Sequence, residues 1–214
     1  CIFGICIGAL APLILVWFLE VKMDVPSIRY LTPTSKPPLS SCPHLERLMA
    51  KSGVMRLKEL SFESGSSHCL KNKLDGFRVL SVMVSPGGRM AEARDLAEYL
   101  KSNNIAFHVD YLCASACVEL MASAPKSSAC YFVVVGNHQG KIFRGENFLS
   151  KIGNLITYPV SWILNRIDEK YQERAGVSPM GVTLRSQAGA ESMSWIPSDR
   201  LVELGYVDTL IECS

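Results

Sequence analysis

Three short segments contain a serine, a histidine and paired glycines in settings that favour acyl-transfer chemistry. Ser115 lies in Cys113-Ala114-Ser115-Ala116-Cys117, and His138 lies in Gly136-Asn137-His138-Gln139-Gly140. Gly87 and Gly88 end the segment Ser85-Pro86-Gly87-Gly88. A serine activated by a histidine base can attack an acyl carbon, and backbone amides at a glycine turn can stabilise the resulting oxyanion. Together the segments indicate a serine nucleophile, a base and an oxyanion hole.

Each segment alone also has a simpler interpretation. A Gly-Gly turn between a strand and a helix is common, and Ser115 suits the N-cap position of the helix that follows it. His138 could be a surface-loop histidine. A Ser–Lys pair, with Lys170 or Lys151 as the base, is an alternative mechanism, although no motif surrounds either lysine.

The expected elements place the three segments at the ends of strands. A helix is expected to start at 41–46, with apolar residues at 45, 48 and 49. The glycine segment 85–88 is expected to end the strand at 77–84. Alternating strands and helices favour an α/β fold with a largely parallel sheet. Periodicity predicts strands at 54–62, 77–84, 105–109, 131–135 and 207–211, and helices at 90–101, 116–124, 156–175 and near 197.

The order of the motifs SPGG, CASAC and VGNHQG resembles that of the Clp-protease/crotonase superfamily. The closest resemblance is to its bacterial membrane-anchored or periplasmic proteins related to the proteolytic subunit of Clp protease. The segments 174–179 and 193–208 are also similar to that group. The resemblance covers residues 54–211 and implies a crotonase/Clp-protease-like domain of ββα units.

The resemblance also implies roles for individual residues. Ser115 would be the nucleophile and His138 its general base, while the amides of Gly87, Gly88 and Ala116 would form the oxyanion hole. Met193 stands where the family has its orienting aspartate. Glu191, two residues away, is therefore the candidate third catalytic residue, and otherwise the site is a Ser–His dyad.

Composition limits the other classes of function. The chain has 214 residues, 48% hydrophobic and 20% charged, which suffices for one well-packed domain, expected at 44–214. Twenty-two basic against 20 acidic residues give no electrostatic reason to expect a nucleic-acid partner. The motifs GxxxxGK[ST], HExxH and CxxC do not occur, so neither a cofactor nor a metal is expected.

The first residues have the composition of a membrane anchor. Cys1–Leu19 contain no charged residue, and about 20 apolar residues span a bilayer as a helix. A cleaved signal peptide or a lipidated Cys1 is the competing interpretation. We therefore expect a single-pass anchor at 1–20, a proline-rich linker at 21–43, and a periplasmic or otherwise extracytoplasmic domain.

The cysteines outside this segment are even in number, which hints at an oxidising compartment. If all were paired, fifteen pairings would be possible, and the alternative is that several are small buried hydrophobes. They are Cys42, Cys69, Cys113, Cys117, Cys130 and Cys213.

Two functions follow as hypotheses. The first is a membrane-tethered serine hydrolase, most simply a peptidase, acting on peptides or proteins near the bilayer. The second is a catalytically inactive Clp-protease-like scaffold or accessory subunit of a membrane complex. Relatives in this superfamily often self-associate, so a homo-oligomer is a further expectation.

Overall fold

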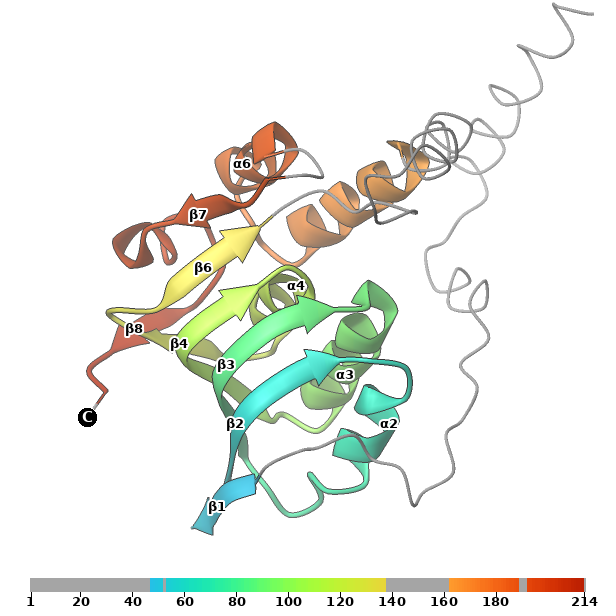
Figure 1. The fold of residues 1–214 in the computed structure, drawn as a ribbon, viewed down its shortest axis with the longest axis vertical. Coiled ribbons are helices and arrows are strands. Elements are labelled where there is room, and N and C mark those ends of the chain that lie inside the picture. The colour runs from blue at the N-terminus through green and yellow to red at the C-terminus, as the bar shows by residue number, and fades with distance from the viewer. Residues whose placement is uncertain (1–46, 52, 138–161, 189–191, 214) are drawn as a thin grey trace, which may run out of the picture. The chain divides into compact units, whose positions relative to one another are not determined.

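The computed structural model describes residues 47–51, 53–137, 162–188 and 192–213 (Figure 1). The chain divides into two compact units, 1–33 with 140–167 and 34–139 with 168–214. The described residues of the first unit, 162–167, are helical. The second unit contains the sheet and Ser115.

The second unit is built on a mostly parallel sheet. Its path runs β1-β2-β3-β4-β5-β8, and β6 pairs with β4 and with β7. Only the β1–β2 and β6–β7 pairs are antiparallel. The strands are β1 (Arg47–Lys51), β2 (Val54–Phe62), β3 (Val79–Gly88), β4 (Ala106–Ala114), β5 (Ser127–Cys130), β6 (Val134–Asn137), β7 (Ser194–Ile196) and β8 (Thr209–Ile211).

The sheet forks along β4. Residues 107–109 of β4 pair with β5, whereas residues 112–114 pair with β6. One branch therefore continues through β5 to β8 and the other through β6 to β7. The second branch places Gly136, near the end of β6, beside Ala114 at the carboxyl end of β4, directly before Ser115.

Helices cover one face of this sheet. Figure 1 shows α2 (Ser66–Lys71), α3 (Met90–Ser102) and α4 (Ala116–Ser123) on one side of β2–β4. Alternate strand residues such as Leu57 and Leu80 are fully buried and form one core with Leu96 of α3. The remaining elements are the helical residues 168–174, α6 (Pro179–Ala188) and the short 3-10 helix η2 (Ser198–Arg200).

The fold class expected from the sequence is confirmed as α/β with a mostly parallel sheet. Strand β2 has the expected bounds, and α3 and α4 agree within a residue or two. The elements α2, β5 and β7 were not anticipated, because each is too short to show a clear period of apolar residues. The ten-residue helix α6 was also not anticipated.

Three expectations were wrong. The helix expected to start at 41–46 does not continue, since residues 47–51 form a strand paired with β2. The glycine segment 85–88 does not end its strand, because Gly87 and Gly88 still pair with the last residues of β2. The buried strand expected at 131–135 begins only at Val134, and Tyr131 and Phe132 are exposed in the turn before it.

Two expected segments lie outside the described residues. These are the membrane anchor at 1–20 and the linker at 21–43. Among the residues that the structure describes, no helix is both long enough and apolar enough to cross a bilayer.

Candidate active site

Ser115 occupies a strained turn between β4 and α4. Its backbone angles are φ 55° and ψ −121°, a region that residues other than glycine rarely adopt. Ser115 is the N-cap residue of α4, as the simpler interpretation expects, but its side chain makes no capping hydrogen bond to that helix. A serine held in a strained strand-to-helix turn is the geometry by which several hydrolases expose their nucleophile.

Gly87 packs directly against this turn. A Cβ atom on Gly87 would lie 2.4 Å from the carbonyl oxygen of Ala114, 2.7 Å from Ser115 Cβ and 3.0 Å from the amide nitrogen of Ala116. The φ of Gly87 is +93°, which also favours glycine. The structure therefore brings Gly87 and Ala116, whose amides are expected to form the oxyanion hole, next to Ser115, the expected nucleophile.

Gly88 has a different role in the packing. Its φ is +135°, and a Cβ there would lie 2.5 Å from the carbonyl oxygen of Phe62. The amide of Arg89 also donates to that carbonyl at 2.8 Å. Gly88 thus lets the end of β3 approach β2 closely, and the contacts to Ser115 come from Gly87 rather than from Gly88.

The end of β6 lies beside Ser115. The Ser115 amide donates to the Gly136 carbonyl at 2.8 Å, and Ala114 pairs with Gly136 in the parallel ladder. Asn137, the next residue, is buried and donates from Nδ2 to the Tyr206 hydroxyl at 3.3 Å, while that hydroxyl donates to the Gly181 carbonyl at 2.9 Å. This chain of hydrogen bonds anchors the last residue of β6.

Two of the predicted site residues, His138 and Glu191, lie outside the described residues, as does Lys151. His138 directly follows Asn137, so its attachment point is the anchored end of β6. Lys170 is exposed to solvent. No carboxyl or amine base is therefore brought to Ser115 by the residues of this set that the structure describes.

Met193 lies beside the same strand end. A Cβ on Gly136 would lie 2.7 Å from Cγ of Met193, and Ser194 pairs with Asn137 in the β6–β7 ladder. The methionine expected in place of an orienting aspartate is thus close to the strand that leads to His138. A thioether is only a weak hydrogen-bond acceptor, so Met193 is a poor substitute for a carboxylate.

A disulfide spans the Ser115 turn. Cys113, in β4, is bonded to Cys117, in α4, and both residues are fully buried. The bond closes a loop around Ser115 and fixes the strand before it to the helix after it. Cys130 and Cys213 form a second disulfide, and Cys69 is also disulfide-bonded. The expectation of paired cysteines is confirmed for these five.

A buried ionic network supports α4 one turn after Ser115. Arg94 of α3 forms ion pairs with Glu119 of α4 and with Asp168, which also pairs with Arg185 at 2.8 Å. Burial is the largest influence on Glu119 and raises the pKa of its carboxyl to about 7, although the Arg94 guanidinium opposes this. The network ties α4 to α3, to α6 and to the helical residues 168–174.

Two parts of this site carry no local signal in the sequence. The hydrogen bond between Asn137 and Tyr206 joins residues 69 positions apart, and Arg94 and Asp168 are 74 positions apart. Glu119 was not predicted as a site residue, although it is the one charged residue of α4.

No protein-family model and no curated protein sequence matches this chain.

Proposed function

We propose that this protein is a membrane-tethered serine hydrolase of the Clp-protease/crotonase type, most simply a peptidase. The observation that carries the proposal is the strained backbone of Ser115, which lies against Gly87 where β3, β4 and β6 end together. Strain of this kind costs of order 1–3 kcal/mol and is typically kept at functional sites.

The reaction would proceed by acyl transfer. Ser115 Oγ attacks the carbonyl carbon of the scissile bond, and its proton passes to His138. Negative charge develops on the carbonyl oxygen, where the amides of Gly87 and Ala116 can donate hydrogen bonds to it. The leaving amine takes the proton from His138, and water then hydrolyses the acyl-enzyme by the same steps.

The third catalytic group is Glu191 if its carboxylate reaches His138, and otherwise the site works as a Ser–His dyad. Loss of the orienting carboxylate in a serine protease reduces the catalytic rate by about 10⁴-fold. A dyad with Met193 beside the strand end would therefore be a slow enzyme.

The proposed compartment is extracytoplasmic, with the domain tethered by residues 1–20. Two buried or half-buried disulfides support an oxidising environment, because cytosolic proteins rarely retain disulfides. The uncharged segment 1–19 supports the tether.

A second candidate function is a catalytically inactive Clp-protease-like subunit of a membrane complex. The observation that favours it is Met193, which lies against Gly136 where the resemblance would place an aspartate. In that case the fold would be retained for association with partner subunits.

Hydrolysis of a panel of peptide and ester substrates by the detergent-extracted full chain distinguishes the two. The matched control for Ser115→Ala is Ser128→Ala, because Ser128 also contacts a histidine, with its Oγ 2.9 Å from His108 Nδ1. A hydrolase would lose turnover in Ser115→Ala and keep it in Ser128→Ala. The inactive subunit would be favoured if the folded wild type shows no turnover and if partner proteins co-purify with both the wild type and the Ser115→Ala variant.

A further inference from the structure

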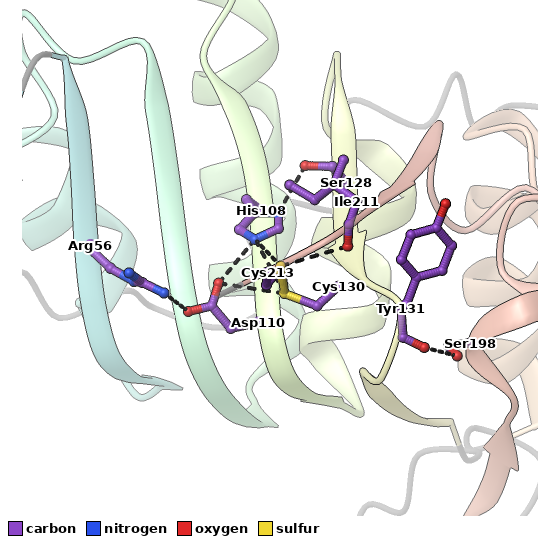
Figure 2. Close-up of a disulfide and its surroundings, with 9 residues drawn as sticks. All are labelled: Arg56, His108, Asp110, Ser128, Cys130, Tyr131, Ser198, Ile211 and Cys213. Carbon is purple, nitrogen blue, oxygen red and sulfur yellow. Dashed lines mark hydrogen bonds and ion pairs between the residues drawn. A yellow bond between two sulfur atoms is a disulfide. The ribbon is translucent and has the colours of Figure 1, made fainter.

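A second polar cluster lies on the sheet face opposite α3 and α4, toward the amino end of β4. His108 and Asp110 project from β4, Cys130 ends β5, and Cys213 follows β8 (Figure 2). Their donor atoms all lie within 4.8 Å of one another. His108 and Asp110 alternate with the core residues Phe107 and Val109, so they share the face that the helices do not cover.

We propose that Cys130 and Cys213, once reduced to thiols, bind Zn²⁺ together with His108 and Asp110. The site would be switched by redox chemistry, since the disulfide excludes the metal and the dithiol admits it. This inference does not depend on the hydrolase activity proposed for Ser115.

The distances already fit a tetrahedral zinc site. Zinc–ligand bonds of about 2.0–2.3 Å give edges of about 3.6 Å between sulfur and nitrogen and about 3.4 Å between nitrogen and oxygen. Nε2 of His108 lies 3.7 Å from each of the two sulfurs and 3.0 Å from Asp110 Oδ1, and Cys130 Sγ lies 4.0 Å from the same oxygen. These four contacts lie within about 0.5 Å of the tetrahedral edges, whereas the two sulfurs, which are bonded to each other, would have to separate to about 3.8 Å.

Neighbouring residues would orient the ligands. Ser128 Oγ lies 2.9 Å from His108 Nδ1 and can accept a hydrogen bond from it, which leaves Nε2 free for the metal. Arg56 pairs with Oδ2 of Asp110, and Oδ1, which contacts Nε2 of His108 at 3.0 Å, would bind the metal (Figure 2). Histidine and carboxylate ligands of zinc are usually held by hydrogen bonds to neighbouring groups.

The charges would also balance. Two thiolates and the Asp110 carboxylate carry three negative charges, and Zn²⁺ with the Arg56 guanidinium supplies three positive charges. The Asp110 side chain is 2% exposed and that of His108 is 13% exposed, so the cluster is largely shielded from water. Such a site needs near neutrality to be stable when buried.

The redox step needs a dithiol reductant. The dithiol gives two electrons and two protons to the disulfide between Cys130 and Cys213 and becomes a disulfide itself. The two new thiols then lose their protons as Zn²⁺ forms two bonds to sulfur. Cys213 is only partly buried, so a reductant can approach the bond from its side.

Cobalt binding tests the proposal, because Co²⁺ replaces zinc and is coloured. The detergent-extracted full chain is reduced with a dithiol, freed of reductant without oxygen, and titrated with Co²⁺. We expect one Co²⁺ per chain, thiolate-to-cobalt charge-transfer bands and the visible bands of tetrahedral cobalt, displaced by Zn²⁺. The oxidised chain is expected to show none of these.

Variants assign the ligands. Cys213→Ser, close to the chain end, is expected to fold and to lose the charge-transfer intensity of one sulfur, and His108→Ala is expected to abolish tight binding. His68→Ala is the matched histidine control and should bind as the wild type does. Ser128→Ala should weaken binding about 10–100-fold, as is typical for residues that orient a metal ligand.

The other disulfide-bonded cysteines that reduction would release are controlled with Cys113→Ala/Cys117→Ala and with Cys69→Ala, and each of these variants should keep the cobalt spectrum. The proposal is overturned if the reduced wild type shows no thiolate-to-cobalt bands. It is also overturned if the bands are unchanged in folded Cys213→Ser, because the metal would then be bound elsewhere.

Discussion

Replacing Gly87 with alanine tests the packing of the active-site turn. The new Cβ would lie 2.4 Å from the Ala114 carbonyl oxygen and 2.7 Å from Ser115 Cβ, whereas ordinary contacts begin at 3.4 Å. The nearest atoms are backbone atoms and the Cβ of a strained residue, so the turn itself must move by about 1 Å.

The expected loss of stability has two parts. An alanine in the left-handed region costs about 1–2 kcal/mol. Overpacking of a tight contact adds about 1–3 kcal/mol. Together they predict that Gly87→Ala lowers the free energy of unfolding by about 2–5 kcal/mol.

Gly76→Ala is the matched control. Gly76 has a similar left-handed φ of +77°, but a Cβ there would meet no atom within 4 Å. This variant should therefore lose only the conformational part, about 1–2 kcal/mol. Urea denaturation of the detergent-extracted full chain, followed by circular dichroism, measures both losses.

The two variants should also differ in activity. Displacing an oxyanion-hole donor lowers the catalytic rate about 10²–10³-fold, and Gly76→Ala should leave the rate unchanged. Equal losses of stability in the two variants would refute the close approach of Gly87 to Ser115. A full rate in Gly87→Ala would refute its role in the oxyanion hole.

Three further predictions concern stability, each measured by urea denaturation. Burial raises the pKa of the Glu119 carboxyl to about 7. Between pH 4.5 and about 7 the folded protein therefore holds a proton that the unfolded chain releases. The free energy of unfolding should fall as the pH rises through this range. Glu119→Gln should remove this part of the pH dependence, and an unchanged profile would contradict the assignment. The chain-entropy model predicts that loss of the Cys130–Cys213 bond, with a sequence separation of 83, lowers the free energy of unfolding by about 4–5 kcal/mol. Loss of the Cys113–Cys117 bond, with a separation of 4, should lower it by about 2 kcal/mol. The reverse order would contradict it. Asn137→Ala should cost about 1–3 kcal/mol by removing a buried hydrogen bond to Tyr206, and a loss near zero would show that this bond does not anchor β6.

The sequence predicted those parts of the fold that depend on local periodicity. Strand β2 alternates apolar residues along its length, and α3 places Ala93, Leu96, Ala97 and Leu100 on one buried face. Short elements such as β5 and β7 were missed, because three or four residues contain no period and their pairing is decided by distant strands.

The candidate site was predictable only in part. The motif order brought Gly87 and Ser115 together, as the structure has them, because Gly87 lies at the end of β3 and Ser115 follows the adjacent parallel strand β4. The end of the strand before the glycine segment was predicted wrongly. Gly87 and Gly88 remain in β3 and allow close backbone contacts with the Ser115 turn and with β2, instead of ending the strand. The cluster of His108, Asp110, Cys130 and Cys213 could not be predicted from ligand spacing, because it joins β4, β5 and the residues after β8.

Labelling of the folded full chain with a fluorophosphonate tests the central claim most directly. The claim predicts that the probe modifies Ser115, as located by mass spectrometry of the digested protein, and that Ser115→Ala and His138→Ala both abolish the modification. Absence of labelling in the folded wild type, or labelling that persists in Ser115→Ala, would contradict the assignment of Ser115 as an activated nucleophile.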